Sequence, residues 1–451
     1  MLLAASLFFY AWGEVFYVGI MLLSILSNYL LGIIIDRTRN NKIAISAAIL
    51  INLLILCVFK YAAFIISNIN NLLGLANLGM LPVPDVHLPL GVSFFTFQAM
   101  SYIFDIYRRK TKPSKNAVNV ALYISMFPQV VAGPIIRYHD IEAQLRKRGL
   151  SFDDFVEGIR RFIMGLAKKV LIADSLAVVV DHIFSVPAGN LSSTLSWIGI
   201  AGYTLQIYYD FSGYSDMAIG LARMFGFHIM ENFNYPYIAR SIREFWRRWH
   251  ISLATWFRDY LYIPLGGNRN STPRTYFNLI TVFFLVGLWH GASWNFVAWG
   301  LCHGFFIIIE RVGFAKVLEQ IYAPLAHAYT LMVVMLTFVI FRTNTLHDAM
   351  LYYNAMFDFS NLGIQAPGIR RFMDHEFFFC LFLGIIGAAP VIPMLSNFID
   401  RLLPGGKRSV AIILGRTVTD YTAVGVLIML LIVSVIKISA GTFHPFIYFR
   451  F

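Results

Sequence analysis

The stretch TYFNLITVFFLVGLWHGASWNFVAWGLCHGFFIII, residues 275–309, contains no Asp, Glu, Lys or Arg. A membrane-spanning helix needs roughly 20 consecutive apolar residues, so this stretch is too long for one perpendicular span. It must tilt, break or hold two segments. Because lipid offers no hydrogen-bond partners to the backbone, such segments fold as helices. The stretch therefore predicts an all-α, polytopic integral membrane protein.

Uncharged runs of the same kind recur along the chain, at residues 15–35, 43–59, 61–84, 86–104, 182–209, 320–341 and 377–399. Charged residues make up only 13% of the 451 residues, whereas a soluble domain carries about 25%. We expect roughly nine to twelve membrane segments, some of them short or re-entrant. No repeat or long linker divides the chain. Residues 1–451 are therefore predicted to form one membrane domain, in which residues 128–310 are richest in motifs.

The formal net charge of +12 has a simple explanation. Basic residues cluster in short loops beside the apolar runs, at residues 37–42, 108–115, 146–169 and 401–416. This distribution is typical of cytoplasmic loops, and an amphipathic segment at 152–169 suggests a helix lying on the cytoplasmic membrane surface. The charge pattern favours membrane lipid, not nucleic acid, as the partner.

His290 lies near the centre of the longest uncharged run. An ionisable side chain at that depth is costly and points to function. Gly287 and Gly291 would let a helix or a substrate come close, and Trp289 would supply a rigid wall. Shelter from water would keep the imidazole neutral, which is the form a general base needs. The alternative is a histidine that only forms a hydrogen bond across a helix pair.

A second histidine follows in the segment SIREFWRRWHISL, which begins at Ser241. We predict one polar, aromatic helix that continues to about residue 260. On such a helix Glu244 would pair with Arg248, and Trp246 would share a face with His250. The alternative is an aromatic-belt helix at the membrane interface, with His250 as one polar member.

Two carboxylates, Asp210 and Asp216, lie at the junction of two apolar runs. Buried carboxylates commonly orient a histidine or pair with arginine, and Arg223 and Arg247 are available partners. Structural ion pairing and substrate binding both remain open for them.

No metal site is expected. His250, His290 and His303 could in principle ligate a metal, but no HExxH or CxxC pattern accompanies them. We expect His303 to be a core histidine.

A neutral, buried histidine without a Ser or Cys nucleophile motif suits direct acyl transfer. The base would take a proton from an acceptor hydroxyl, and the hydroxyl oxygen would then attack a thioester carbonyl. Thioesters form in the cytoplasm, whereas the acceptor can lie outside. Two other classes compete with this reading: a transporter or flippase without chemistry, and a scaffold that only recruits an external transferase.

Five motifs carry a resemblance along residues 4–451: PQVVAGPI (128–135), YDFSGYSDMAIG (209–220), EFWRRWHIS (244–252), GLWHG (287–291) and PFIYFRF (445–451). With them the chain resembles the membrane-bound O-acyltransferase family, and within it the bacterial branch that acts on alginate and teichoic acid. The resemblance implies a ring of helices around a thinned centre, with a funnel from each side. It implies that His290 is the catalytic histidine and His250 its second histidine. Substrate-binding residues are then expected among Trp246, Trp289, Asp210, Asp216, Arg247 and Arg248.

The resemblance also implies the reactants. No cofactor is bound permanently, and the donor is acetyl-CoA or an acyl-carrier thioester. The acetyl group would cross the bacterial inner membrane to a separate extracytoplasmic SGNH-type O-acetyltransferase, which modifies alginate or another cell-surface glycan. D-alanyl transfer to a cell-wall polymer is the alternative. Family members usually carry a further hydrophobic segment before the part that resembles LAASLFFYAW, residues 3–12, so we expect one helix fewer or an upstream start codon.

Overall fold

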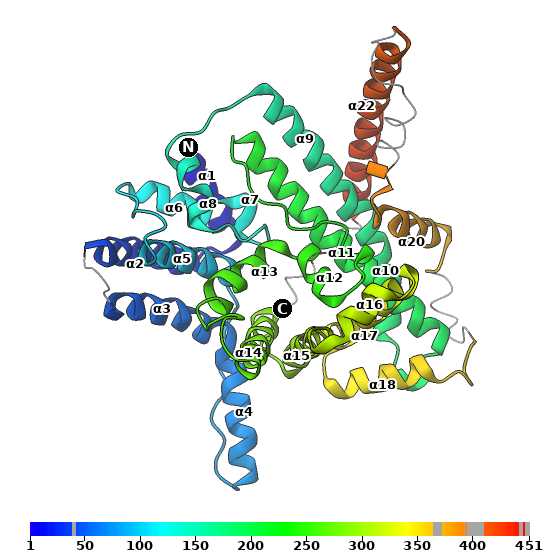
Figure 1. Cartoon of the computed structure of the whole chain (residues 1–451), viewed down its shortest axis with the longest axis horizontal. Helices are drawn as coiled ribbons and strands as arrows, with labels where there is room; N and C mark the ends of the chain where they lie inside the picture. Colours follow the sequence, from blue (N-terminus) through cyan, green and yellow to red (C-terminus); the bar gives the residue numbers. More distant parts are fainter. Residues whose placement is uncertain (38–41, 364–371, 392, 395–409, 442–444, 447–451) are drawn as a thin grey trace.

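The computed structural model describes residues 1–37, 42–363, 372–391, 393–394, 410–441 and 445–446 (Figure 1). These residues form helices and connecting loops, with no strand among them, so the all-α prediction is confirmed. Several predicted features lie outside the described residues, namely Arg39, Arg401, Lys407, Arg408 and residues 447–451 of the C-terminal motif.

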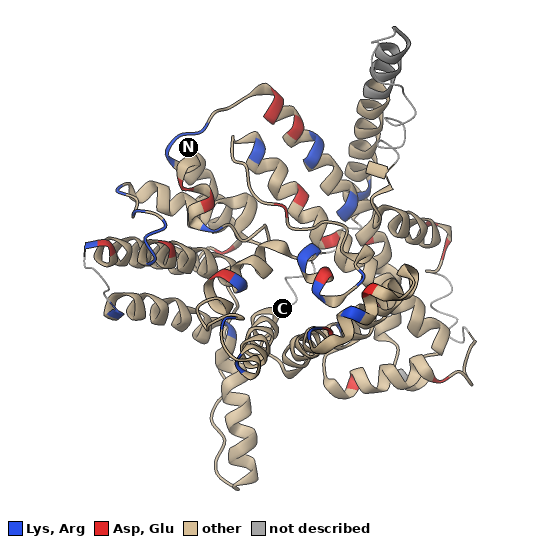
Figure 2. Ribbon diagram, in the orientation of Figure 1, with Lys and Arg blue, Asp and Glu red and all other residues tan. Residues whose placement is uncertain are grey.

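Four helical stretches of the described chain are long and apolar enough to cross a membrane: Val18–Arg37, Lys42–Leu75, Ala323–Arg342 and Tyr421–Ser439. The first is α2, and the second joins α3 (Lys42–Leu56), the π-helix η1 (Cys57–Tyr61) and α4 (Ala62–Leu75). The third is α17, and the fourth is part of α22 (Val410–Ser439). Helices α4 and α22 project from the body in Figure 1, and Figure 2 shows α4 without charge. Their exposed apolar side chains fit contact with lipid.

The uncharged stretch that opened the sequence analysis holds two helices. Helix α14 (Thr272–His290) and helix α15 (Trp294–Ile309) pack against each other. A Cβ on Gly287 would lie 2.3 Å from the carbonyl oxygen of Phe296, and one on Gly300 would lie 2.3 Å from that of Phe283. The backbones of the two helices therefore touch, and only glycine fits at these positions.

Helix α5 (Val92–Tyr107) is buried along most of its length. Helix α11 (Ser193–Met224) is similarly enclosed and runs beside α9 (Phe152–Ala167) and the π-helix η2 (Lys168–Ala173). Glycines again allow the contact, because a Cβ on Gly165 would lie 2.5 Å from the carbonyl oxygen of Gly213.

Residues 152–169 form the predicted helical segment, and its place on the membrane surface stays a prediction. Three of its basic side chains turn inward, whereas Arg160 is exposed. Arg161 and Lys168 pair with Asp216 of α11, and Lys169 pairs with Asp210. Apolar side chains of the same helix, including Phe155 and Ile159, are exposed instead. The sequence pattern gave the amphipathic character, but the charges that attract the basic face lie on a helix distant in sequence.

The remaining elements frame the centre of the fold. The longer ones are α1 (Leu2–Gly13), α6 (Ala117–Ser125), α8 (Tyr138–Arg146), α10 (Asp174–Ser185), α18 (Leu346–Phe357) and α20 (His375–Gly387). The shorter α-helices are α7 (Phe127–Val130), α12 (Ile242–Arg248), α13 (Ile251–Phe257) and α16 (Ala315–Gln320). Short 3-10 or π segments are η3 (Ala188–Asn190), η4 (Pro236–Ile238), η5 (Arg258–Tyr262) and η6 (Glu310–Phe314).

Candidate active site

His290 is the last residue of α14, and its side chain is buried among aromatic rings. The centroid of its ring lies 4.9 Å from that of Trp299, 5.0 Å from that of Trp289 and 5.5 Å from that of Phe341, each in an edge-to-face arrangement. Such rings hold the imidazole in one orientation.

A cavity of about 370 Å³, which we call the outer cavity, borders His290. Trp289 and His290 line it together with Lys60 and residues 92–94 at the start of α5. A carboxylate–histidine pair also lines it, with Glu14 Oε2 3.2 Å from His87 Nε2. His290 therefore borders open space, although both nitrogens of its ring are buried.

The predicted helix from Ser241 to about residue 260 is wrong, because the chain breaks at residues 249–250. Helix α12 ends at Arg248, and His250 has φ 46° and ψ 52° before α13 begins. The backbone leaves helical geometry to pair with a neighbouring segment: the Asn234 amide donates to Arg248 O at 2.9 Å, and the Ile251 amide donates to Asn232 O at 2.9 Å. A left-handed residue with a side chain is strained, and such strain is found often at functional sites.

Asn232 fixes the imidazole of His250. Its Oδ1 lies 3.1 Å from His250 Nδ1, and it accepts hydrogen bonds from Ser252 Oγ at 2.8 Å and from the Ser252 amide at 3.2 Å. Asn232 Nδ2 donates to Ser215 Oγ at 3.1 Å, which sets the orientation of the amide. An acceptor opposite Nδ1 places the ring hydrogen on that nitrogen and leaves the lone pair on Nε2. His250 is thus held as a base with a defined tautomer.

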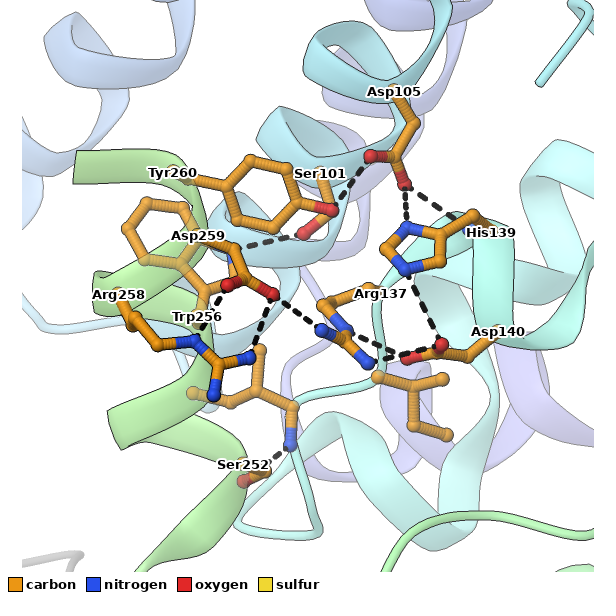
Figure 3. A network of polar contacts seen from close by, with 12 residues as sticks. Ser101, Asp105, Arg137, His139, Asp140, Ser252, Trp256, Arg258, Asp259 and Tyr260 are labelled. Atoms are coloured by element: carbon orange, nitrogen blue, oxygen red, sulfur yellow. Dashed lines mark hydrogen bonds and ion pairs between the residues drawn. The ribbon is translucent and has the colours of Figure 1, made fainter. Parts of the chain in front are cut away.

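Ser252 connects this arrangement to the PQVVAGPI segment. Its Oγ accepts from the Ile135 amide at 3.0 Å while donating to Asn232. One turn later, Trp256 Nε1 donates to Ser101 Oγ of α5 at 2.8 Å. The loop after α7 and helix α5 therefore hold the segment that carries His250 (Figure 3).

A buried carboxylate continues the network in Figure 3. Asp105 accepts from Tyr260 Oη at 2.8 Å and lies 2.8 Å from His139 Nδ1. Nearby, Arg137 lies 2.5 Å from Asp259. Although burial raises it, the pKa of the Asp259 carboxyl is lowered overall by hydrogen bonds and charge from Arg258 and Arg137. These pairs stabilise the relative placement of α5, α8 and η5.

Trp289 lies beside both histidines. The centroid of its ring is 6.0 Å from that of His250 and 5.0 Å from that of His290. Its Nε1 is buried and has no hydrogen-bond partner among the described residues. A buried donor without a partner is rare in folded proteins, so this N–H group is a candidate hydrogen-bond donor to a bound molecule.

A second cavity of about 710 Å³, the basic cavity, is lined by residues of α12, α13, η5, α14 and η6. Its lining includes Trp246 and four arginines, Arg243, Arg247, Arg258 and Arg311. Arg108, which follows α5, donates to Asp259 O at 2.7 Å, beside that lining. The outer cavity opens at the start of the same helix. On α14, Val286 lines the basic cavity and His290, one turn later, lines the outer cavity.

A third cavity of about 480 Å³ has an almost wholly apolar lining. It shares Trp289 with the outer cavity and Phe257 with the basic cavity. Trp289 therefore borders two cavities, the outer cavity and the apolar one.

The other predicted site residues divide into two groups. Trp246 and Arg247 line the basic cavity, and Trp246 Nε1 also donates to His303 Nδ1 at 3.3 Å. His303 Nε2 lies 3.1 Å from Thr337 Oγ1, so both of its ring nitrogens have partners in the core. Arg248 pairs with Glu244 at 2.9 Å as predicted, and is not part of the cavity lining.

Asp210 and Asp216 lie apart from the outer and basic cavities. Lys169 lies 2.6 Å from Asp210, and Lys168 lies 2.6 Å from Asp216. The expected partner Arg223 instead pairs with Asp154. Both carboxylates belong to α11 and form ion pairs with η2, and Asp216 also pairs with Arg161 of α9. Their role in substrate binding remains a prediction. No three His, Cys, Asp or Glu side chains converge as metal ligands in the described part of the chain.

Sequence reasoning missed Asn232 and Lys60. Asn232 gave no signal, because helix α12 separates it in the sequence from its partners His250 and Ser252. Lys60 did give one: it is the single charged residue between two long uncharged runs, and a charge inside a membrane helix is a functional hypothesis by default.

Comparisons with known proteins identify the family of the chain. The sequence model of the membrane-bound O-acyltransferase family matches residues 44–347. The chain is 38% identical to the probable alginate O-acetylase of Azotobacter vinelandii, over 100% of this chain and 94% of that protein. It is 35% identical to the peptidoglycan O-acetyltransferase of Helicobacter pylori, over 80% of this chain and 74% of that protein. A teichoic acid D-alanyltransferase of Bacillus subtilis is 29% identical over 48% of this chain and 56% of its own length.

The family match covers more than half of the chain, and the probable alginate O-acetylase of Azotobacter vinelandii aligns over its full length. Together with apolar helices long enough to cross a bilayer, this settles the class of the protein. The chain is a multi-pass membrane O-acyltransferase and belongs to the membrane-bound O-acyltransferase family.

Proposed function

We propose that this protein takes an acetyl group from a cytoplasmic thioester and passes it across the bacterial inner membrane for O-acetylation of an extracytoplasmic polysaccharide. The observation that carries the proposal is a pair of cavities along α14: His290 lines one, and Val286, one turn earlier, lines the other together with four arginines. The positive-inside pattern would put the basic cavity on the cytoplasmic side, because Arg108 of the basic loop 108–115 donates to Asp259 O, next to Arg258 of the lining.

The basic cavity suits an anionic donor. Among the described residues, the side chains of Arg243, Arg247 and Arg311 form no ion pair with this chain. Guanidinium groups bind phosphate with paired hydrogen bonds, so the phosphates of acetyl-CoA fit this lining. A carrier protein that presents a phosphopantetheine thioester is the second candidate, because it would meet the same arginines from outside.

The acceptor approaches from the outer cavity. His290 takes the proton of the acceptor hydroxyl, whose oxygen attacks the thioester carbonyl. The carbon–sulfur bond breaks, the acetyl ester forms, and the thiolate leaves with a proton returned by the imidazole. The Trp289 N–H group can donate to the carbonyl oxygen as negative charge develops there. His250, with its lone pair on Nε2, is a second proton acceptor beside the same indole.

The relatives named for alginate and peptidoglycan acetylation support a polysaccharide as the final acceptor. A separate extracytoplasmic SGNH-type transferase would complete the transfer to the glycan. D-alanyl transfer is the second candidate, favoured only by the more distant match to a teichoic acid enzyme.

The test compares surface polysaccharide from host cells with the wild-type gene, without the gene, and with His290→Ala. Alkali-labile acetyl esters are expected in the first strain alone, and their mass separates acetyl from D-alanyl cargo. Normal ester levels with properly folded His290→Ala protein would rule out the base role and would favour a transporter.

A further inference from the structure

Lys60 lies near the middle of the 34-residue membrane-crossing helix 42–75. The helix changes there to the π-helix η1, which ends with Lys60 and Tyr61. Insertions of this kind inside α-helices occur frequently at functional sites. Both side chains reach the end of α14, which carries His290.

The last turn of an α-helix leaves four carbonyl oxygens without helical partners. In α14 each of these four carbonyl oxygens accepts a hydrogen bond, and side chains of η1 donate to three of them. Gly287 O accepts from the Gly291 amide at 3.3 Å. Leu288 O accepts from Tyr61 Oη at 3.0 Å. Lys60 Nζ donates to Trp289 O at 2.5 Å and to His290 O at 3.4 Å.

The number of N–H donors on Lys60 decides whether it holds α14 in place or binds a ligand. An ammonium group has three N–H donors, and its third acceptor is Ser93 Oγ at 3.3 Å. All three donors therefore have partners within the protein. A cation at a helix C-terminus is also favoured by the helix dipole. The arrangement fits a group that holds α14 in place better than one that waits for a ligand.

We propose that Lys60 and Tyr61 are positioning residues for acyl transfer: from η1 they fix the end of α14, and with it the imidazole of His290 and the indole of Trp289. This inference rests on the proposed role of His290. Loss of the hydrogen bonds from Lys60 and Tyr61 would move His290 and Trp289. It would not alter the basic cavity, because Lys60 does not line it.

The experiment measures transfer from labelled acetyl-CoA into alkali-labile polymer in inside-out membrane vesicles of the host, per folded protein molecule. Lys60→Met is expected to lower the maximal rate by about 10²-fold, since a displacement of about 1 Å at a catalytic group can cost that much. The KM for acetyl-CoA should not change. Lys60→Arg should restore part of the rate, and Tyr61→Phe should lower it by less than Lys60→Met.

Asn68→Ala is the matched control. Asn68 lies on the same helix and accepts from Trp294 Nε1 at 2.9 Å, so it joins α4 to the start of α15 and not to the end of α14. Its maximal rate should stay near that of the wild type.

His290→Ala separates the two proposals. If it abolishes transfer while Lys60→Met keeps the maximal rate or changes only KM, the positioning role is wrong and the proposed function stands. If His290→Ala keeps transfer, the proposed function itself fails. Should Lys60→Met not accumulate in the membrane, Tyr61→Phe decides: an unchanged maximal rate overturns the inference.

Discussion

At the scale of single residues, the two histidines differ in what holds them. His290 is enclosed by Trp289, Trp299 and Phe341 and borders a cavity. His250 is wholly buried and is held by the side chain of Asn232. The first borders open space, whereas the orientation of the second depends on a hydrogen bond that sets its tautomer.

Asn232→Ala removes that acceptor and frees the His250 ring to exchange tautomers. We expect folded protein to lose acyl transfer by up to about 10²-fold, because a small misplacement of a reacting group is enough. Asn234→Ala is the control, since Asn234 is exposed and joins Arg248 through backbone groups. Equal transfer rates for the two variants, measured as labelled ester formed in vesicles, would show that Asn232 does not act through His250.

At the scale of elements, local pattern was sufficient where helices follow from apolar runs. The uncharged residues 275–309 had to tilt, break or hold two segments, and they hold α14 and α15. The break at Trp249–His250 was not predictable, because its cause is pairing with residues 232–234. The inward face of α9 had the same kind of cause, since Asp216 lies on another helix. Long-range partners override local periodicity in both cases.

The contact between α14 and α15 gives a test of packing. Gly300→Ala would place a methyl group 2.3 Å from the carbonyl oxygen of Phe283, so the two helices must separate. We expect a loss of stability of about 1–3 kcal/mol, seen as a lower melting temperature of the detergent-solubilised protein. Gly425→Ala in α22 is the control, because nothing lies within 4 Å of its Cβ position. Equal melting temperatures would contradict the close packing.

At the scale of the whole molecule, charge is distributed unevenly between two openings. Four arginines line the basic cavity, whereas the outer cavity combines Lys60 with Glu14 and His87. Figure 2 places many of the charged residues on α9, α11 and the short central helices, and few on the projecting ones. Sequence indicated the basic residues of this region but could not show that they face one cavity, because α12, η5 and η6 come together only in the fold.

Arg247→Gln tests the basic cavity as the donor site. Removing one phosphate-binding charge should raise the KM for acetyl-CoA by about tenfold with little change in maximal rate, because a charge-assisted hydrogen bond is worth about 1.5–3 kcal/mol. Arg269→Gln, an exposed change in the same region outside the lining, should leave the KM unaltered. A titration of acetyl-CoA in inside-out vesicles measures both. An unchanged KM for Arg247→Gln would remove the donor from this cavity.

The most direct measurement tests whether His290 is needed to move an acetyl group from one side of the membrane to the other. Sealed inside-out vesicles from the host receive labelled acetyl-CoA on the outside, and alkali-labile label protected in the lumen is counted. Wild-type vesicles should accumulate lumenal ester, and vesicles with an equal amount of folded His290→Ala protein should accumulate none. Equal lumenal ester in both preparations would contradict the account.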